Sequence, residues 1–210
     1  MNKLRYIVVE GPIGAGKTTL ARRLSVRLGT DLLLEQPDEN PFLARFYQDM
    51  ARYALPTQLF FLFQRAKQLE PLAQLDLFGR ATVADFLIDK DPLFARVTLS
   101  ADELSLYQRI FDAVRPQAPA PDLVVYLQAR PDILVERVRR RSAEYERRVS
   151  EEYLAVLAES YARFFYHYAA APLLIVNSEN LNFVERDADF ELLIERVRGM
   201  KSRREFFNLG

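Results

Sequence analysis

The stretch YIVVEGPIGAGKTTLARRL, residues 6–24, joins a short apolar run to a glycine-rich turn and the start of a helical pattern. Within it Gly11, Gly16, Lys17 and Thr18 satisfy the pattern G-x-x-x-x-G-K-[ST], which lies between a strand and a helix in phosphate-binding loops. Glycines let backbone N–H groups approach phosphate oxygens, and the N-terminus of the following helix favours negative charge. The stretch therefore predicts a P-loop; the alternative is a glycine turn that binds no ligand.

The predicted P-loop assigns a role to each of its polar side chains. We expect Lys17 to contact the β- and γ-phosphates and Thr18 to bind Mg²⁺. ATP and Mg²⁺ are therefore the expected cofactors. The residues expected to contact the nucleotide are Gly11, Pro12, Ile13, Gly14, Ala15, Gly16, Lys17, Thr18 and Thr19.

Apolar runs of strand length alternate with helical patterns along the rest of the chain. The expected strands are 6–9, 31–34, 82–86, 123–127 and 173–176. The expected helices are 17–28, 41–52, 57–75, 101–114, 131–141, 151–169 and 184–198. This alternation is typical of an α/β fold in which helices cover both faces of a parallel sheet. We expect one domain over residues 1–210, with a five-stranded parallel sheet flanked by helices.

The composition limits the classes of partner. Lys and Arg together number 29 and are balanced by 29 Asp and Glu, so no overall charge favours nucleic acid or an anionic membrane. The chain has no cysteine and one histidine, which excludes disulfides, thiolate metal sites and multi-histidine sites. No apolar run approaches the length of a membrane span or a signal sequence. We therefore expect a cytoplasmic protein with a small-molecule partner, binding neither nucleic acid nor membrane.

Other P-loop proteins carry features that this sequence does not show. A GTPase needs the guanine-reading N-K-x-D, but the only Asn-Lys pair is Asn2-Lys3, followed by Leu4 and Arg5 ahead of the first strand. A helicase or motor ATPase usually has a longer chain and a basic track for its polymer. A small-molecule kinase is the simplest interpretation that remains.

A carboxylate follows the second predicted strand. Glu35 comes directly after residues 31–34, and ligands of parallel sheets collect at the carboxyl ends of the strands. Phosphoryl transfer needs a group that orients or deprotonates the attacking hydroxyl. Glu35 can be that group. The alternatives are a solvated loop carboxylate and a charge at the N-terminus of the helix that follows Asn40.

Two polar residues interrupt an otherwise apolar helix. Gln58 and Arg65 are seven residues apart in the predicted helix 57–75, so they project from one face. A glutamine amide offers both a donor and an acceptor to the edge of a flat heterocycle. The pattern favours a ligand-facing pair, the alternative being that both side chains point to solvent.

Arginines crowd the break between two predicted helices. Arg137 and Arg141 share a helical face, and further arginines follow at positions 139, 140, 147 and 148. They could close over a triphosphate as a lid, placed at about residues 139–149. The alternatives are a solvated helix end and a local RNA-binding patch. The interleaved Glu136, Glu144 and Glu146 argue against RNA.

On these residues the chain resembles the deoxynucleoside kinases, in particular the bacterial deoxyadenosine and deoxyguanosine kinases. The likeness runs from the P-loop to NSENLNFVERDADFELLIERV, residues 177–197, and so covers nearly the whole chain. The resemblance implies transfer of the ATP γ-phosphate to the 5′-hydroxyl of a deoxynucleoside in nucleotide salvage. It also implies a homodimer formed through helices beside the sheet.

The resemblance also implies roles for particular residues. Glu35, followed by NPFLARFY at 40–47, matches the family's general base, and Gln58 with Arg65 matches its base-reading glutamine and arginine. Tyr47, eleven residues before Gln58, matches the tyrosine that holds the sugar 3′-hydroxyl, with Glu146 as its expected partner.

Two further matches complete the set implied by the resemblance. Arg137 and Arg141 are similar to the family's lid arginines, which act at the transferred phosphate. Phe94, in DPLFA, corresponds to an aromatic residue that stacks on the base.

The third predicted strand departs from the pattern of many family members. Those members end this strand with an acidic-Arg-Ser sequence, but here TVADFLIDKD, residues 82–91, gives Asp85 followed by Phe86. We expect Asp85 to keep the metal-binding role, while the arginine is missing at that place. Bacterial purine-preferring relatives share this kind of departure, which favours a purine substrate. Asp89 and Asp91 with Lys90 are left as alternatives for contacts to the base.

Two rival functions follow from the same motifs. A thymidylate kinase shares the P-loop but binds an acceptor that already carries a phosphate, and the run after Glu35 supplies only Arg45 and Arg52 for it. A regulatory module that binds ATP without catalysis is the rival from another class.

Overall fold

The computed structural model describes residues 4–73, 80–116, 118–140 and 148–209. Within them the strands form a single sheet, in which every pair of neighbouring strands is parallel and the order is β2-β3-β1-β4-β5-β6. The strands are β1 (Tyr6–Glu10), β2 (Asp31–Leu33), β3 (Thr82–Ala84), β4 (Leu123–Gln128), β5 (Leu173–Asn177) and β6 (Arg204–Phe207). The predicted α/β fold with a parallel sheet is confirmed.

The prediction of five strands is wrong, because β6 adds a sixth at the edge beside β5. Its sequence REFF begins with two charged residues and reads as a polar tail. An edge strand needs burial on only part of its surface, so charged residues are compatible with it. Glu205 accepts hydrogen bonds from the N–H groups of Lys201 and Ser202, which fixes the turn into β6.

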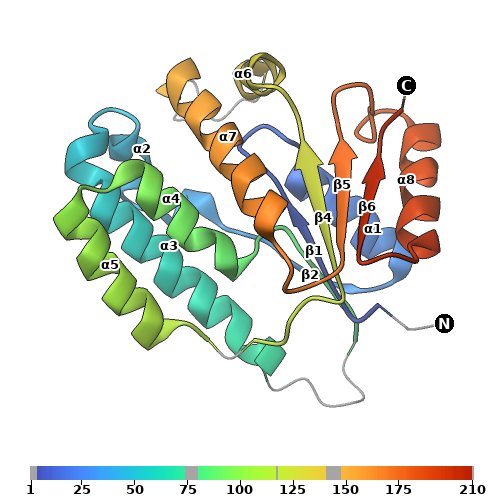
Figure 1. The fold of residues 1–210 in the computed structure, drawn as a ribbon, viewed down its shortest axis with the longest axis horizontal. Helices are drawn as coiled ribbons and strands as arrows, with labels where there is room; N and C mark the ends of the chain where they lie inside the picture. Colours follow the sequence, from blue (N-terminus) through green and yellow to red (C-terminus); the bar gives the residue numbers. More distant parts are fainter. Residues whose placement is uncertain (1–3, 74–79, 117, 141–147, 210) are drawn as a thin grey trace.

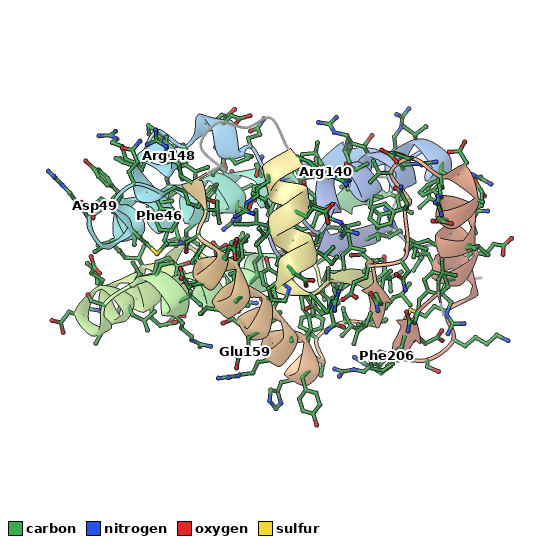
Figure 2. The ribbon with its side chains drawn as sticks, turned by 90° about the horizontal axis from the view of Figure 1, so that it is seen from above. Phe46, Asp49, Arg140, Arg148, Glu159 and Phe206 are labelled. Atoms are coloured by element: carbon green, nitrogen blue, oxygen red, sulfur yellow. The ribbon has the colours of Figure 1, made fainter. Side chains whose placement is uncertain are left out.

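Helices cover both faces of the sheet (Figure 1). Helices α1 (Lys17–Leu28) and α8 (Asp187–Gly199) pack on one face around Leu20, Leu24 and Leu193. The other face is covered by α3 (Met50–Ala73), α4 (Asp91–Thr98), α5 (Ala101–Val114) and α7 (Glu151–His167). Helix α6 (Pro131–Arg140) lies at the carboxyl ends of the strands. Seen from above, Phe46 and Phe206 lie near opposite ends of the molecule (Figure 2).

Two predicted helices have different bounds in the structure. In place of the helix expected over 41–52 there is a short α2 (Leu43–Phe46), and α3 begins at Met50 and continues through Pro56. The side chain of Asp49 accepts a hydrogen bond from the N–H of Arg52, which provides a local start for α3. Helix α4 was not predicted, because its eight residues are too few for a clear helical period.

The strand order determines which residues meet. Because β1 lies between β3 and β4, with β2 beyond β3, the P-loop after β1 is close to the residues that follow β3 and β2. These residues are Asp85 and Glu35. Gly11 must be glycine because a Cβ there would lie 2.6 Å from the carbonyl oxygen of Leu127. Gly16, at φ 95°, takes the left-handed conformation that starts α1.

No helix within the described residues has both the length and the apolar character that a membrane crossing requires.

Candidate active site

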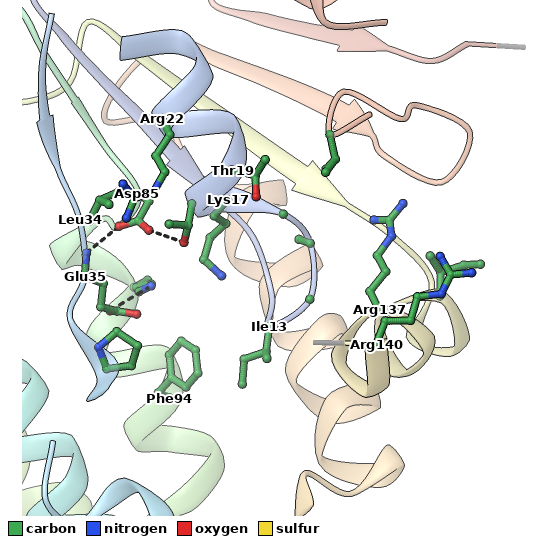
Figure 3. Close-up of a pocket in the computed structure, with 18 of the residues that line it drawn as sticks. Ile13, Lys17, Thr19, Arg22, Leu34, Glu35, Asp85, Phe94, Arg137 and Arg140 are labelled. Carbon is green, nitrogen blue, oxygen red and sulfur yellow. Dashed lines mark hydrogen bonds and ion pairs between the residues drawn. The ribbon is translucent and has the colours of Figure 1, made fainter. Parts of the chain in front are cut away.

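A cavity of about 1000 Å³ opens at the carboxyl ends of the strands. The P-loop residues Ile13 to Thr19 lie in its middle. One end, called here the α3 end, is lined by Phe46, Tyr47, Gln58, Phe61, Arg65 and Phe94. The other, called the α6 end, is lined by Ile133, Glu136, Arg137, Arg140, Leu181 and Val184. Figure 3 shows Lys17 between Glu35 on one side and Arg137 and Arg140 on the other.

The P-loop lysine is held by the loop itself. Nζ of Lys17 donates to the carbonyl oxygens of Gly11 at 2.7 Å and Pro12 at 3.1 Å. Burial and the nearby charge of Lys90 lower the pKa of Lys17, although neighbouring carboxylates oppose the shift. Gly11 and Pro12 thus contact Lys17 and do not line the cavity, whereas the other predicted P-loop residues do.

Asp85 joins the P-loop to the segment after β2. Its Oδ2 accepts a hydrogen bond from Oγ1 of Thr18 at 2.6 Å, and its Oδ1 accepts one from the backbone N–H of Glu35 at 2.7 Å (Figure 3). Burial raises the pKa of Asp85, and these two hydrogen bonds oppose the shift. One carboxylate therefore fixes the relative positions of both segments.

The hydroxyl of Thr18 and the carboxylate of Asp85 are suitable ligands for a magnesium ion. Mg²⁺ prefers oxygen ligands and usually takes only one or two from the protein, with the remainder from phosphates and water. Thr18 and Asp85 offer a hydroxyl and a carboxylate beside the P-loop. No cluster of three or more His, Cys, Asp or Glu that could hold a metal occurs in the part of the chain that the structure describes. The residues thus fit a metal that enters with the nucleotide.

Glu35 is an ionised carboxylate between two cations. Its Oε1 accepts from Nε of Arg65 at 2.7 Å and from Nη2 of the same guanidinium, and Nζ of Lys90 lies 3.7 Å away. Burial on its own raises the pKa of Glu35, but the charges of Arg65, Lys90 and Lys17 outweigh it and lower the pKa to about 2. The alternative of a solvated loop carboxylate does not fit these contacts.

Gln58 and Arg65 lie on one face of α3 and point to the cavity, as predicted. They are 4% and 3% exposed, which excludes the alternative that they face solvent. Nε2 of Gln58 is 3.5 Å from Oγ1 of Thr98, a long contact that leaves the amide largely available. Tyr47 and Phe94 line the same end of the cavity.

Of the three carboxylates that follow β3, only Asp85 lines the cavity. Asp91 forms an ion pair with Nη1 of Arg65 behind the cavity wall, and burial raises its pKa to about 6 although Arg65 and Lys90 oppose the shift. Asp89 pairs with Arg115 at 2.5 Å, outside the cavity.

The arginines of α6 line the opposite end of the cavity. Arg137 donates from Nη1 to Oγ of Ser178 at 3.1 Å and from Nη2 to the carbonyl oxygen of Ser178 at 2.6 Å. Arg140 pairs with Glu136 at 2.7 Å. Arg141 and Glu146, with most of the predicted lid at 139–149, lie outside the described residues.

Sequence reasoning missed several residues of this site. It did not identify Glu10, which forms a buried ion pair with Lys90 beneath Glu35, or the segment 181–185 at the α6 end. Lys90 was expected only as an alternative contact to the base, and Arg140 only as part of the lid. A charged residue at the end of a buried strand, as Glu10 is, was a signal available in the sequence.

Known proteins are similar to this chain over most of its length. The model of the family described as "Deoxynucleoside kinase" matches residues 7–201. A protein of Bacillus subtilis (strain 168) named deoxyguanosine kinase is 33% identical over 203 residues, covering 94% of this chain and 98% of the relative. Another from the same strain, named deoxyadenosine/deoxycytidine kinase, is 29% identical and covers 93% of this chain and 92% of its own length.

Solved structures share the fold. The structure of deoxyadenosine kinase from M. mycoides with bound dATP superposes with a TM-score of 0.80 at 24% identity. The match covers 92% of this chain and 99% of that structure's chain.

Proposed function

The chain belongs to the deoxynucleoside kinase family, and on that premise we propose that it transfers the γ-phosphate of ATP to the 5′-hydroxyl of a purine deoxynucleoside. The observation that carries the proposal is the position of Glu35. Its carboxylate lies in the cavity between the P-loop, which suits the triphosphate, and the α3 end, which suits a flat base. A purine is favoured because relatives from Bacillus subtilis carry the names deoxyguanosine kinase and deoxyadenosine/deoxycytidine kinase, each of which includes a purine deoxynucleoside.

Glu35 acts on the attacking hydroxyl. The 5′-oxygen forms a bond to the γ-phosphorus, the bond from that phosphorus to the β–γ bridging oxygen breaks, and ADP leaves. In a loose transition state the hydroxyl keeps its proton until late, so the base mainly orients the oxygen. A carboxylate whose pKa is about 2 is a weak base, which is adequate for this late transfer and guarantees that Glu35 is ionised beforehand.

The α3 end holds the deoxynucleoside. The amide of Gln58 reads the edge of the base, and the ring of Phe94 stacks on the base. Arg65, two helical turns after Gln58 on α3, assists Gln58 in reading the base. Tyr47 contacts the sugar 3′-hydroxyl, with Glu146 as its partner. The support for Gln58 is that its amide is buried, lines the cavity and makes one long contact to Thr98.

The phosphates lie along the P-loop. Lys17 exchanges its two carbonyl contacts for phosphate oxygens, and Arg137 and Arg141 neutralise charge from the lid side. Thr18 and Asp85 hold Mg²⁺, which when bound neutralises charge on the β- and γ-phosphates. The short contact between Thr18 and Asp85 supports their shared role.

We also propose that the enzyme is a cytoplasmic homodimer. Helices α3 and α5 pack against each other, and each leaves a large apolar side chain exposed. Phe63 on α3 is 52% exposed and Leu106 on α5 is 47% exposed. Burial of such side chains in a dimer would be favourable.

The rival functions find less support in the cavity. A thymidylate kinase needs free cations at the α3 end for the phosphate of its acceptor, but Arg65 is paired with Glu35 and Asp91. Arg45 and Arg52, which the sequence offered for that role, do not line the cavity. The regulatory module that binds ATP without catalysis does not require an ionised glutamate beside the P-loop, so the position of Glu35 favours the kinase.

The test is transfer of phosphate from Mg·ATP to each of the four deoxynucleosides, with thymidylate and adenosine in parallel. Preferential turnover of deoxyadenosine or deoxyguanosine is the expected result. Turnover of thymidylate, or binding of ATP with no turnover of any acceptor, would overturn the proposal in favour of the first or the second rival.

A further inference from the structure

Lys90 is a buried cation in the wall of the cavity. It ends the 3₁₀ turn η2 (Ile88–Lys90), lines the cavity at the α3 end and is only 1% exposed. An ammonium group removed from water is costly unless carboxylates compensate its charge. The partners of Lys90 therefore indicate what it is held there to do.

The first partner is Glu10, which fixes where the ammonium lies. Glu10 is fully buried at the end of β1 and accepts hydrogen bonds from the N–H of Gly11 at 2.9 Å, the N–H of Leu87 at 2.8 Å and the hydroxyl of Tyr161 at 3.0 Å. Nζ of Lys90 lies 3.3 Å from this carboxylate. Glu10 is thus hydrogen-bonded to three parts of the fold, which are the P-loop, the segment that follows β3, and helix α7. It is therefore a rigid anchor for Lys90.

The second partner is Glu35, and the contacts to it are one-sided. Nζ of Lys90 is 3.7 Å from Oε1, the same oxygen that accepts from Nε and Nη2 of Arg65. Among the described residues, both hydrogen bonds to the carboxylate of Glu35 go to Oε1, and none goes to Oε2. An arginine that meets a carboxylate usually engages both oxygens in a parallel fork. Here a second cation attracts Oε1, which disfavours rotation of the carboxylate into that fork.

We propose that Lys90 is a positioning residue for the phosphoryl transfer: together with Arg65 it clamps Oε1 of Glu35, so that Oε2 remains available to the 5′-hydroxyl of the deoxynucleoside. Glu10 acts through Lys90 by holding its ammonium in place. The proposal rests on the proposed role of Glu35 as the group that orients the hydroxyl. Without Lys90, Arg65 engages both oxygens of Glu35, and the hydroxyl loses its partner.

A purely structural role makes a different prediction. If Lys90 served only to neutralise Glu10, removing both charges together would restore a normal enzyme. The paired variant Glu10→Gln/Lys90→Met does this, because it replaces a buried ion pair by neutral groups of similar shape and leaves no buried charge uncompensated. Its kcat and its dissociation constant for the deoxynucleoside, measured beside those of the wild type, separate the two roles.

We expect the paired variant to bind the deoxynucleoside within a few-fold of the wild type and to lose about 10- to 100-fold in kcat, the scale of a small misplacement of reacting groups. Lys90→Arg, which keeps the cation, is expected to retain more kcat than Lys90→Met, and this comparison serves if the paired variant does not fold. A paired variant with wild-type kcat, or Lys90→Arg no better than Lys90→Met, overturns the proposal.

A double-mutant cycle tests whether Lys90 acts through Glu35. In the Glu35→Gln background, the Glu10→Gln/Lys90→Met substitutions are expected to cost no further kcat, because residues that act as a unit are not additive. If the paired substitutions lower kcat as much in the Glu35→Gln background as they do in the wild type, the proposal is overturned. If Glu35→Gln alone keeps its turnover, the proposed role of Glu35 fails and Lys90 loses its target. If the paired variant keeps wild-type turnover while Glu35→Gln loses it, the proposed role of Lys90 fails and the proposed role of Glu35 stands.

Discussion

Oδ1 of Asp85 accepts a hydrogen bond from the backbone N–H of Glu35 at 2.7 Å, so the residue expected to bind metal also positions the residue expected to act on the hydroxyl. The same carboxylate accepts from Thr18 through its other oxygen. On these expected roles, metal binding and orientation of the hydroxyl are joined at one side chain, and substitutions there can separate the two.

Asp85→Asn should weaken the use of Mg²⁺ while keeping the position of Glu35. Asparagine retains an oxygen for the N–H of Glu35 but loses the negative charge, so we expect the Mg²⁺ concentration for half-maximal activity to rise about tenfold or more. Titration of activity with Mg²⁺ at saturating ATP measures this. Asp85→Ala, which also removes the hydrogen bond, should lose additional kcat; equal behaviour of the two variants would contradict the positioning role.

Glu35→Gln should abolish most turnover without releasing the deoxynucleoside. The amide keeps an oxygen for Arg65 but cannot take up the proton, so kcat should fall by about 100- to 10,000-fold. Rates of ADP formation and calorimetric titration with the deoxynucleoside give the two quantities. Glu39→Gln is the matched control, because Glu39 is an exposed carboxylate on the same segment that does not line the cavity. Near-normal kcat in Glu35→Gln would remove Glu35 from the mechanism.

Gln58→Ala should reduce discrimination between bases more than it reduces kcat. Loss of the hydrogen bonds to the base edge should raise KM for the preferred deoxynucleoside about tenfold or more. The ratios of kcat/KM across the four deoxynucleosides report the effect. Gln64→Ala on the same helix is the control, since Gln64 contacts Glu39 and the carbonyl of Gln36 away from the cavity. Unchanged ratios in Gln58→Ala would place base recognition elsewhere.

The charge of Glu35 should contribute to stability in a pH-dependent way. Its pKa is lowered to about 2 in the folded protein from the ordinary value of 4.5, so its contribution is present above pH 4.5 and lost as the pH falls from there toward 2. The free energy of unfolding of the wild type should therefore exceed that of Glu35→Gln at pH 7, and the gap should narrow below pH 4.5. Urea denaturation of both proteins at several pH values measures the gap. A gap independent of pH would mean that packing causes it.

Phe63→Glu should convert the proposed homodimer to a monomer. A charge at this exposed position on α3 would be buried against the partner, at a cost that association does not offset. Light scattering after size-exclusion chromatography gives the mass in solution. Val26→Glu, at an exposed apolar residue on α1, is the control on the opposite face of the sheet. A dimer that survives Phe63→Glu would use another surface.

Much of the site could be predicted from the sequence, because its motifs are local. The P-loop lies between a strand and a helix within one short stretch, and Glu35 and Asp85 follow strands whose parallel order brings them together. The helical spacing of Gln58 and Arg65 was sufficient to place both on one face.

The contacts that the sequence did not predict are those between distant segments. The sequence suggested only contacts to the base for Lys90, because its buried partner Glu10 lies 80 positions earlier and no local pattern joins the two residues. The edge strand β6 was missed because its pairing with β5, and not its own amino-acid composition, makes it a strand. Likewise α3 extends through Pro56, where tertiary packing overrides the local preference of proline.

Helix α3 carries Gln58, Phe61 and Arg65, whereas the P-loop, Asp85 and the arginines of α6 belong to other elements. On the proposed function, α3 therefore carries the base-reading Gln58 together with Arg65, whose contacts to Glu35 serve the phosphoryl transfer. A duplicated copy can change its base preference through substitutions on this helix, provided that Arg65 and its contacts to Glu35 are kept. Two similar proteins of one Bacillus strain bear the names of kinases for different deoxynucleosides, the outcome that such divergence would leave.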